Sequence, residues 1–161
     1  KILADELGAV HVNTDAARVK LRKAGKLMDD AARISSREAQ EALMAGKSVI
    51  ADFDAVRPVR QRELQRLAER FGARFYLIDV KTPERLILAR LRQKRYTPSD
   101  LFANAREAIR VYFIRKAFRT RFLTKRFTGS FTVDNSKPLG SQIDRITEAI
   151  QENAQRSHVK G

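Results

Sequence analysis

Apolar residues follow two periods along the chain, and the two periods alternate. Short, nearly continuous apolar runs are typical of strands, and apolar residues three and four positions apart are typical of helices. Strands are predicted at 9–13, 48–53, 74–80 and 131–133, and helices at 1–7, 29–45, 58–71, 82–91, 99–127 and 141–150. The alternation predicts an α/β fold with helices on both faces of a sheet.

Two features of this pattern make sharper predictions. The run at 48–53, SVIADF, is that of a strand covered on both faces. Apolar residues at 99–127 do not keep to one stripe, which predicts a broadly buried helix or two helices with a break.

Helix starts are predicted from the residues that cap helices. Thr82-Pro83 offers a capping hydroxyl and a proline for the first turn, and Thr97-Pro98 repeats the pair. Ser141 and Asp144 have the spacing of a capping box.

Length and composition favour a single domain. The 161 residues, of which 43% are hydrophobic, suit one domain at 1–155 with a flexible tail at 156–161. No apolar run is long enough for a membrane span, and the start does not resemble a leader peptide, so a cytoplasmic protein without a membrane partner is expected. With no cysteine and only His11 and His158, thiolate and histidine-rich metal sites are excluded.

Charge adds a preference for anionic partners. Lys and Arg number 33 against 19 Asp and Glu, a net charge of +14. Thirteen of these cations lie between Arg85 and Arg126, where Asp100 and Glu107 are the acids. Nucleotides, nucleic acid and phosphorylated metabolites all fit such a field, and charge does not choose among them.

Four polar stretches are expected near the ends of strands, where open parallel sheets bind ligands. They are residues 13–18, 52–54, 89–95 and 132–136. In this order they resemble the P-loop, AAA-type ATP-binding kinases that include gluconate kinase, zeta-toxin-like kinases and polynucleotide 5′-kinases. The resemblance covers Lys1 to about Ile150, and implies a three-layer αβα P-loop NTPase-like fold with a mostly parallel sheet.

Within this resemblance, Asp15 and Arg18 match the Asp-x-x-Arg that follows the second strand of these kinases. The resemblance implies that Asp15 takes the proton of the acceptor hydroxyl and that Arg18 binds the substrate. An attacking alcohol needs a carboxylate within hydrogen-bonding reach. The alternative is that Asp15 only caps the next helix.

The other stretches imply a site for ATP and Mg²⁺. Asp52 corresponds to the carboxylate that orients the magnesium shell, with Asp54 two residues on as an alternative. In the basic stretch, Arg90 and Arg95 are assigned to transfer and Arg92 to the nucleotide, with Lys94 beside them, since guanidinium groups bind phosphate oxygens in forked pairs. Asp134 and Asn135 match the loop bordering the adenine.

The phosphate loop itself is not in this sequence. Gly46-Lys47-Ser48 imitates its end, but Glu41 stands where the first glycine is required and a strand follows, whereas a phosphate loop opens a helix. The loop and the central first strand of the fold are therefore expected upstream of Lys1, and the chain as given is expected to be inactive without them.

The function predicted is transfer of the γ-phosphoryl group of ATP to a hydroxyl of a small molecule or a nucleic-acid 5′ end. The alternative is a non-catalytic nucleic-acid-binding protein with a degenerate kinase fold, which would use the Arg85–Arg126 region.

Overall fold

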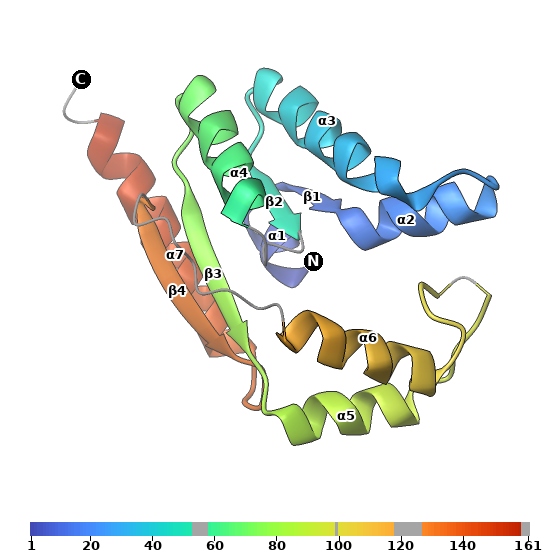
Figure 1. The fold of residues 1–161 in the computed structure, drawn as a ribbon. Coiled ribbons are helices and arrows are strands. Elements are labelled where there is room, and N and C mark those ends of the chain that lie inside the picture. The colour runs from blue at the N-terminus through green and yellow to red at the C-terminus, as the bar shows by residue number, and fades with distance from the viewer. Residues whose placement is uncertain (53–57, 99, 118–126, 159–161) are drawn as a thin grey trace.

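A computed structural model describes residues 1–52, 58–98, 100–117 and 127–158 (Figure 1). The elements are α1 (Ile2–Glu6), β1 (Val10–Asn13), α2 (Thr14–Lys23), the 3₁₀ turn η1 (Met28–Asp30), α3 (Ala31–Met44), β2 (Val49–Asp52), α4 (Pro58–Arg70), β3 (Tyr76–Lys81), α5 (Glu84–Gln93), α6 (Ala105–Ala117), β4 (Gly129–Asp134) and α7 (Gly140–His158). The predicted α/β alternation is confirmed, and the interval between β1 and β2 holds α2 as well as the predicted α3.

The strands form two parallel pairs. β1 pairs with β2, and Asn13 lies opposite Asp52 at their carboxyl ends. β3 pairs with β4, and Lys81 lies opposite Asp134. Within the described ranges no strand joins β2 to β3. The fold is thus the predicted P-loop NTPase-like αβα arrangement, with parallel strands and its central strand missing.

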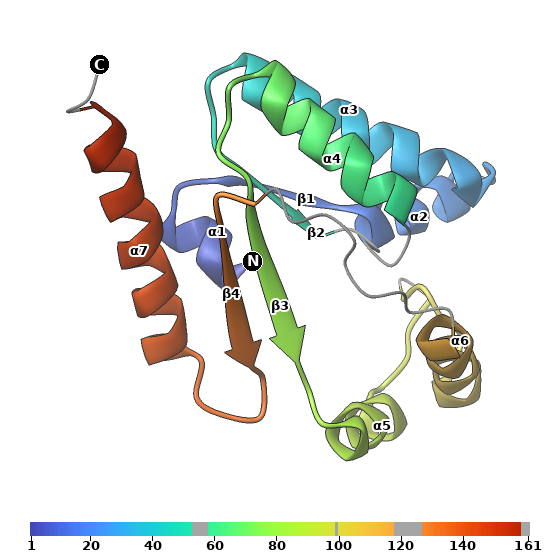
Figure 2. The same ribbon diagram turned by 60° about the vertical axis from the view of Figure 1, so that its left-hand side comes forward.

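Helices cover both faces of the strands (Figure 2). α1 and α7 lie on one side of β3 and β4, and α3 and α4 lie on the other side of the molecule. Ile146 of α7 is fully buried at the centre of the main core. Its partners from α1, β4, α7, β2 and β3 are Leu3, Val133, Ile143, Ile50 and Ile78. Because Ile50 and Ile78 contact the same core, the two strand pairs are held beside the same helices.

A smaller core fixes α2 against α3. Ala17 and Leu21 of α2 are buried against Ala31, with Ile34 packed on the cluster. This packing holds the first turn of α2, which is the part of the helix nearest to the polar stretches.

The prediction that β2 is covered on both faces is wrong. Val49 and Ile50 are half-buried, but Ala51 and Asp52 are exposed. Among the described strands only β1 pairs with β2, so β2 is an edge strand in this part of the chain.

Of the two alternatives predicted for 99–127, a broadly buried helix is wrong for the described part, and the alternative of two helices with a break extends over 118–126, outside the described residues. In α6 only Ala108 is buried, and Phe113 and Ile114 are exposed. Figure 1 shows the reason, since α6 lies along α5 and away from the strands.

Three predicted helix caps differ in the structure. The helix expected at Thr97-Pro98 begins instead at Ala105, after Asn104, whose side chain accepts a hydrogen bond from the Glu107 amide at 3.0 Å. α5 has Pro83 as its cap residue and no capping side chain, because the Thr82 hydroxyl accepts a hydrogen bond from Asn135. α7 already begins at Gly140, which places Ser141 inside the helix.

Candidate functional site

The amino terminus of α2 is joined to the end of β2 by Asn13. The Asn13 side-chain oxygen accepts a hydrogen bond from the Ala16 amide at 3.0 Å and so caps α2. Its amide nitrogen donates to the Asp52 carboxylate at 3.1 Å. Asn13 is therefore the cap, and the alternative that Asp15 caps this helix is wrong.

Asp15 lies in the first turn of α2 with a carboxylate that the cap does not use. It forms an ion pair with Arg18, one turn along the helix. The side chains of Asp15 and Arg18 are 51% and 24% exposed, so the carboxylate is within reach of solvent and the guanidinium is partly covered. The positive end of the helix dipole favours a carboxylate at this position.

Asp15 lines a pocket of about 340 Å³ between α2 and the segment that follows α5. The α2 side supplies Ala16 and Val19 as well as Asn13 and Asp15, and the other wall is formed by Leu91, Lys94, Tyr96, Asp100, Leu101 and Phe102. The volume is at the lower end of the range of about 300–1,000 Å³ that ligand pockets span.

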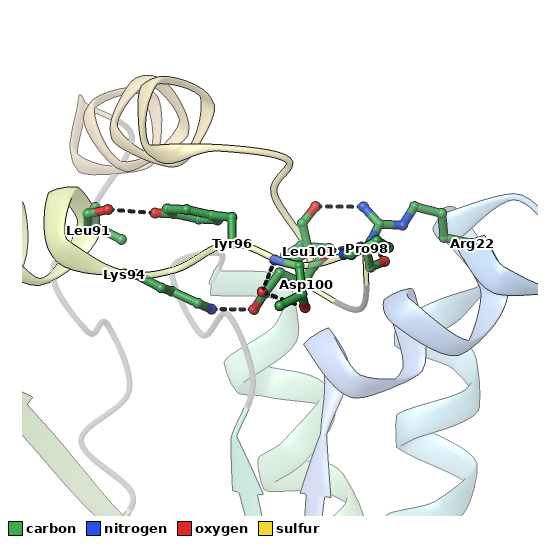
Figure 3. A network of polar contacts seen from close by, with 8 residues as sticks. Arg22, Leu91, Lys94, Tyr96, Pro98, Asp100 and Leu101 are labelled. Atoms are coloured by element: carbon green, nitrogen blue, oxygen red, sulfur yellow. Dashed lines mark hydrogen bonds and ion pairs between the residues drawn. The ribbon is translucent and has the colours of Figure 1, made fainter.

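Arg22 of α2 holds the far wall of this pocket in place (Figure 3). Its guanidinium donates to three backbone carbonyls, those of Leu101 at 3.1 Å, Pro98 at 3.0 Å and Asp100. These acceptors lie 76 to 79 residues further along the chain. The connection ties the segment between α5 and α6 to α2.

Asp100 and Lys94 form the second set of contacts in this wall. The Asp100 carboxylate pairs with the Lys94 ammonium and accepts hydrogen bonds from the Thr97 amide at 2.8 Å and the Thr97 hydroxyl at 3.0 Å. Lys94, and next the Thr97 amide, lower the pKa of Asp100 to about 2. The Lys94 ammonium also lies 5.5 Å from the centre of the Tyr96 ring, and the Tyr96 hydroxyl donates to the Leu91 carbonyl at 2.8 Å.

A second group of predicted residues meets at the carboxyl ends of β3 and β4. Arg90 of α5 donates to the Asn135 carbonyl at 3.2 Å, and the Asn135 side chain donates to the Thr82 hydroxyl at 3.2 Å. Asp134 accepts hydrogen bonds from the Ser136 hydroxyl and amide, which lower the pKa of its carboxyl group. The structure thus brings Arg90, Asp134 and Asn135 together.

Arg92 and Arg95 are exposed and lie on or just after the last turn of α5. The structure leaves them outside the contact between Arg90 and Asn135. Their predicted roles remain predictions.

The surroundings of Asp52 leave room for its predicted role as a magnesium ligand. It is exposed at the end of β2 and accepts one hydrogen bond from Asn13. Within the described residues no group of three or more His, Cys, Asp or Glu could hold a metal ion. Mg²⁺ usually takes one or two carboxylates with water and substrate phosphate oxygens, so the single Asp52 carboxylate fits that mode. Asp54, the alternative, lies outside the described residues.

A comparison with protein-family models agrees with this arrangement of strands and with the site at α2. A family model described as an AAA domain matches residues 1–114, more than half of the chain. The chain belongs to the AAA domain family. This membership supports a nucleotide-binding domain of the P-loop NTPase-like type.

The comparisons go no further than the family. A search of curated proteins and of solved structures found no significant match, so the likeness to gluconate kinase, zeta-toxin-like kinases and polynucleotide kinases stays a prediction. Across the described part of this AAA domain protein, no helix is both long and apolar enough to cross a bilayer.

Sequence reasoning missed Arg22 and Gln142. Arg22 is one of three basic residues in the last turn of α2, where a cation is expected from the helix dipole alone. Gln142 accepts a hydrogen bond from the Asp134 amide at 2.8 Å and donates to the Asp134 and Pro138 carbonyls, so it orders the loop after β4. No local pattern marks either residue, because their partners are set by the tertiary fold.

Proposed function

We propose that this AAA domain protein is an ATP-dependent kinase that phosphorylates a hydroxyl group, with Asp15 as the general base. The observation that carries the proposal is the placement of Asp15. Asn13 caps α2 in its place, and Asp15, which the cap does not use, lines a pocket of about 340 Å³.

The reaction follows from that placement. The acceptor oxygen forms a bond to the γ-phosphorus, the bond from that phosphorus to the β–γ bridging oxygen breaks, and ADP leaves. ATP supplies the phosphoryl group, and Asp52 would help to hold Mg²⁺, which would supply positive charge beside the phosphates. Asp15 accepts the proton of the acceptor hydroxyl, and Arg18 orients both the Asp15 carboxylate and the acceptor.

The nucleotide side of the proposal uses the second group of residues. Arg90 contacts the loop after β4, so α5 and the loop that carries Asp134 and Asn135 form one unit. We assign Asp134 and Asn135 to the border of the adenine. Arg90 and Arg95 then stabilise charge during transfer, and Arg92 binds the phosphates.

The test compares the parent protein with Asp15→Asn, using the gene product with any residues that its gene encodes before Lys1. Asparagine keeps the size of the side chain but cannot accept the proton. General-base help is worth about 10²–10⁴-fold, so single-turnover transfer from ATP should fall by about that factor while ATP affinity stays within about twofold. Asp29→Asn, a change in η1, is the control.

Near-normal transfer by the Asp15→Asn protein would remove Asp15 from the reaction. A parent protein that binds ATP but phosphorylates no hydroxyl compound would refute the kinase proposal itself.

A second candidate is nucleic-acid binding by the Arg85–Arg126 region, favoured by the net charge of +14. Two of its lysines are already paired within the fold, Lys94 with Asp100 and Lys116 with Glu84. If this region binds phosphate backbones, affinity for a short single strand should fall steeply as salt rises, because bound phosphates release counterions. Binding that is absent or insensitive to salt favours the kinase.

A further inference from the structure

The pocket beside Asp15 is apolar over much of its wall. Val19, Leu91, Leu101 and the rings of Tyr96 and Phe102 line it. The Tyr96 hydroxyl is already bonded to the Leu91 carbonyl, so the tyrosine offers the pocket mainly its ring. Apolar and aromatic side chains of this kind bind a flat or hydrocarbon part of a ligand.

The cations around the pocket are engaged with protein groups. Lys94 lines the pocket but is paired with Asp100 and lies against the Tyr96 ring. Arg18 is paired with Asp15, and Arg22 directs its guanidinium to the carbonyls of the far wall (Figure 3).

The charges of the described lining residues make the same point. Asp15 and Asp100 contribute two negative charges, which the paired Arg18 and Lys94 balance with two positive charges. A phosphate or carboxylate on the acceptor would therefore have to displace an existing ion pair. A neutral molecule does not meet this cost.

We infer that the acceptor of this AAA domain protein is a small neutral alcohol with an aromatic or other flat apolar part, and not a phosphorylated or carboxylated compound. The inference rests on the proposed function for the identity of the reacting hydroxyl. The apolar part packs against Tyr96 and Phe102, and the hydroxyl faces Asp15. In this arrangement Asp100 determines specificity, because it neutralises Lys94.

The experiment measures binding and transfer separately for matched probes. The first pair is uridine and 3′-uridine monophosphate, which share the ring and a free 5′-hydroxyl. The second pair is 3-phenyl-1,2-propanediol and 3-phenyllactate, and glycerol serves as a neutral alcohol without an apolar part. Affinities are measured by nuclear magnetic resonance titration, with the ring signals of Tyr96 and Phe102 as reporters, and transfer is measured from labelled ATP.

The neutral member of each pair should bind more tightly than its anionic partner, by up to about fivefold, because one partly exposed ion pair contributes up to about 1 kcal/mol. Glycerol should bind more weakly than both neutral aromatic probes. In Asp100→Asn the Thr97 hydrogen bonds can persist while Lys94 loses its countercharge, so the preference should shrink or reverse by about fivefold. Adding Lys94→Gln should restore it.

Asp30→Asn is the matched control, since it breaks an exposed aspartate–arginine pair with Arg33 in η1 and α3 and should leave the preference unchanged. Tighter binding of the anionic probes, or binding of neither aromatic alcohol, overturns the inference. Preferential binding of the neutral probes without transfer upholds the binding class and refutes the kinase proposal. Transfer that favours the anionic probes upholds the kinase and overturns the acceptor class.

Discussion

Removing the Arg22 side chain should release the segment between α5 and α6 without unfolding the protein. In Arg22→Ala the carbonyls of Pro98, Asp100 and Leu101 lose a common donor. These hydrogen bonds connect the Arg22 side chain of α2 to this segment. The substitution does not change the core contacts of α2, which are made by Ala17 and Leu21.

The magnitude follows from the three hydrogen bonds. A hydrogen bond from a charged group contributes about 1.5–3 kcal/mol, and the three are not additive because they share one guanidinium at a half-buried position. We therefore expect a loss of about 2–3 kcal/mol for the closed form of the segment. Since about 1.4 kcal/mol is a factor of ten, opening should become about 30- to 150-fold more frequent.

Hydrogen exchange followed by mass spectrometry measures this opening directly. Peptides that cover 94–104 should exchange about 30- to 150-fold faster in Arg22→Ala, because local opening sets the exchange rate of the amides that it exposes. The Asp100 amide, which donates to the Thr97 carbonyl at 2.9 Å, is the most informative site. Peptides from α3 and α7 should keep their rates.

Arg33→Ala is the control, because Arg33 is 79% exposed and pairs only one turn away with Asp30. Such surface pairs contribute about 0–1 kcal/mol, so its exchange pattern should be nearly that of the parent. Unchanged exchange at 94–104 in Arg22→Ala would show that the segment is held by something other than Arg22 and would refute the reasoning.

Two further predictions concern the rest of the fold. The Lys116 ammonium, and next the Tyr112 hydroxyl, lower the pKa of Glu84, so the contact of α6 with α5 should be fully present above about pH 4.5, the ordinary value, and lost as pH falls below it. Protection of the α6 amides, measured as the exchange rate relative to the intrinsic rate at each pH, should decrease over that range in the parent and stay constant in Glu84→Gln. Ile146→Ala should lower the free energy of unfolding, measured in urea, by about 2–5 kcal/mol, because Ile146 is fully buried. Met44→Ala, at a residue that is 66% exposed, should lower it by less than about 1 kcal/mol. Equal losses would contradict the assigned core.

The strands and most helices could be predicted from the sequence because their patterns are local. The apolar run at 74–80 became β3, and glycines at the ends of α1, α3 and α4 have positive φ. Helix-stop signals of this kind depend on the backbone of one residue, so neighbours in space do not change them.

The wrong predictions concern features that depend on tertiary contacts, namely helix capping and burial. Thr82 has a side chain that commonly caps helices. In the structure its hydroxyl instead accepts a hydrogen bond from Asn135 in the loop after β4. The apolar residues of α6 predicted burial, yet burial depends on which elements lie beside the helix, and Phe113 stays exposed. The placement of Asp15 and Asp52 near one edge followed from the parallel strand order, whereas the use of Asn13 to bridge them did not.

The two groups of candidate residues belong to different strand pairs. Arg22 is therefore expected to couple the two groups as well as to stabilise the fold. Asn13, Asp15 and Asp52 are carried by β1, α2 and β2, whereas Arg90 and Asn135 are carried by α5 and the loop after β4. The segment from Lys94 to Phe102 follows directly from α5 and forms the far wall of the Asp15 pocket. Under the kinase proposal, movement of α5 over a nucleotide should therefore also shift the pocket beside Asp15, because Arg22 of α2 is hydrogen-bonded to that segment. Filling the acceptor pocket and closing the nucleotide side are therefore expected to favour each other, and the coupling should weaken when Arg22 is removed.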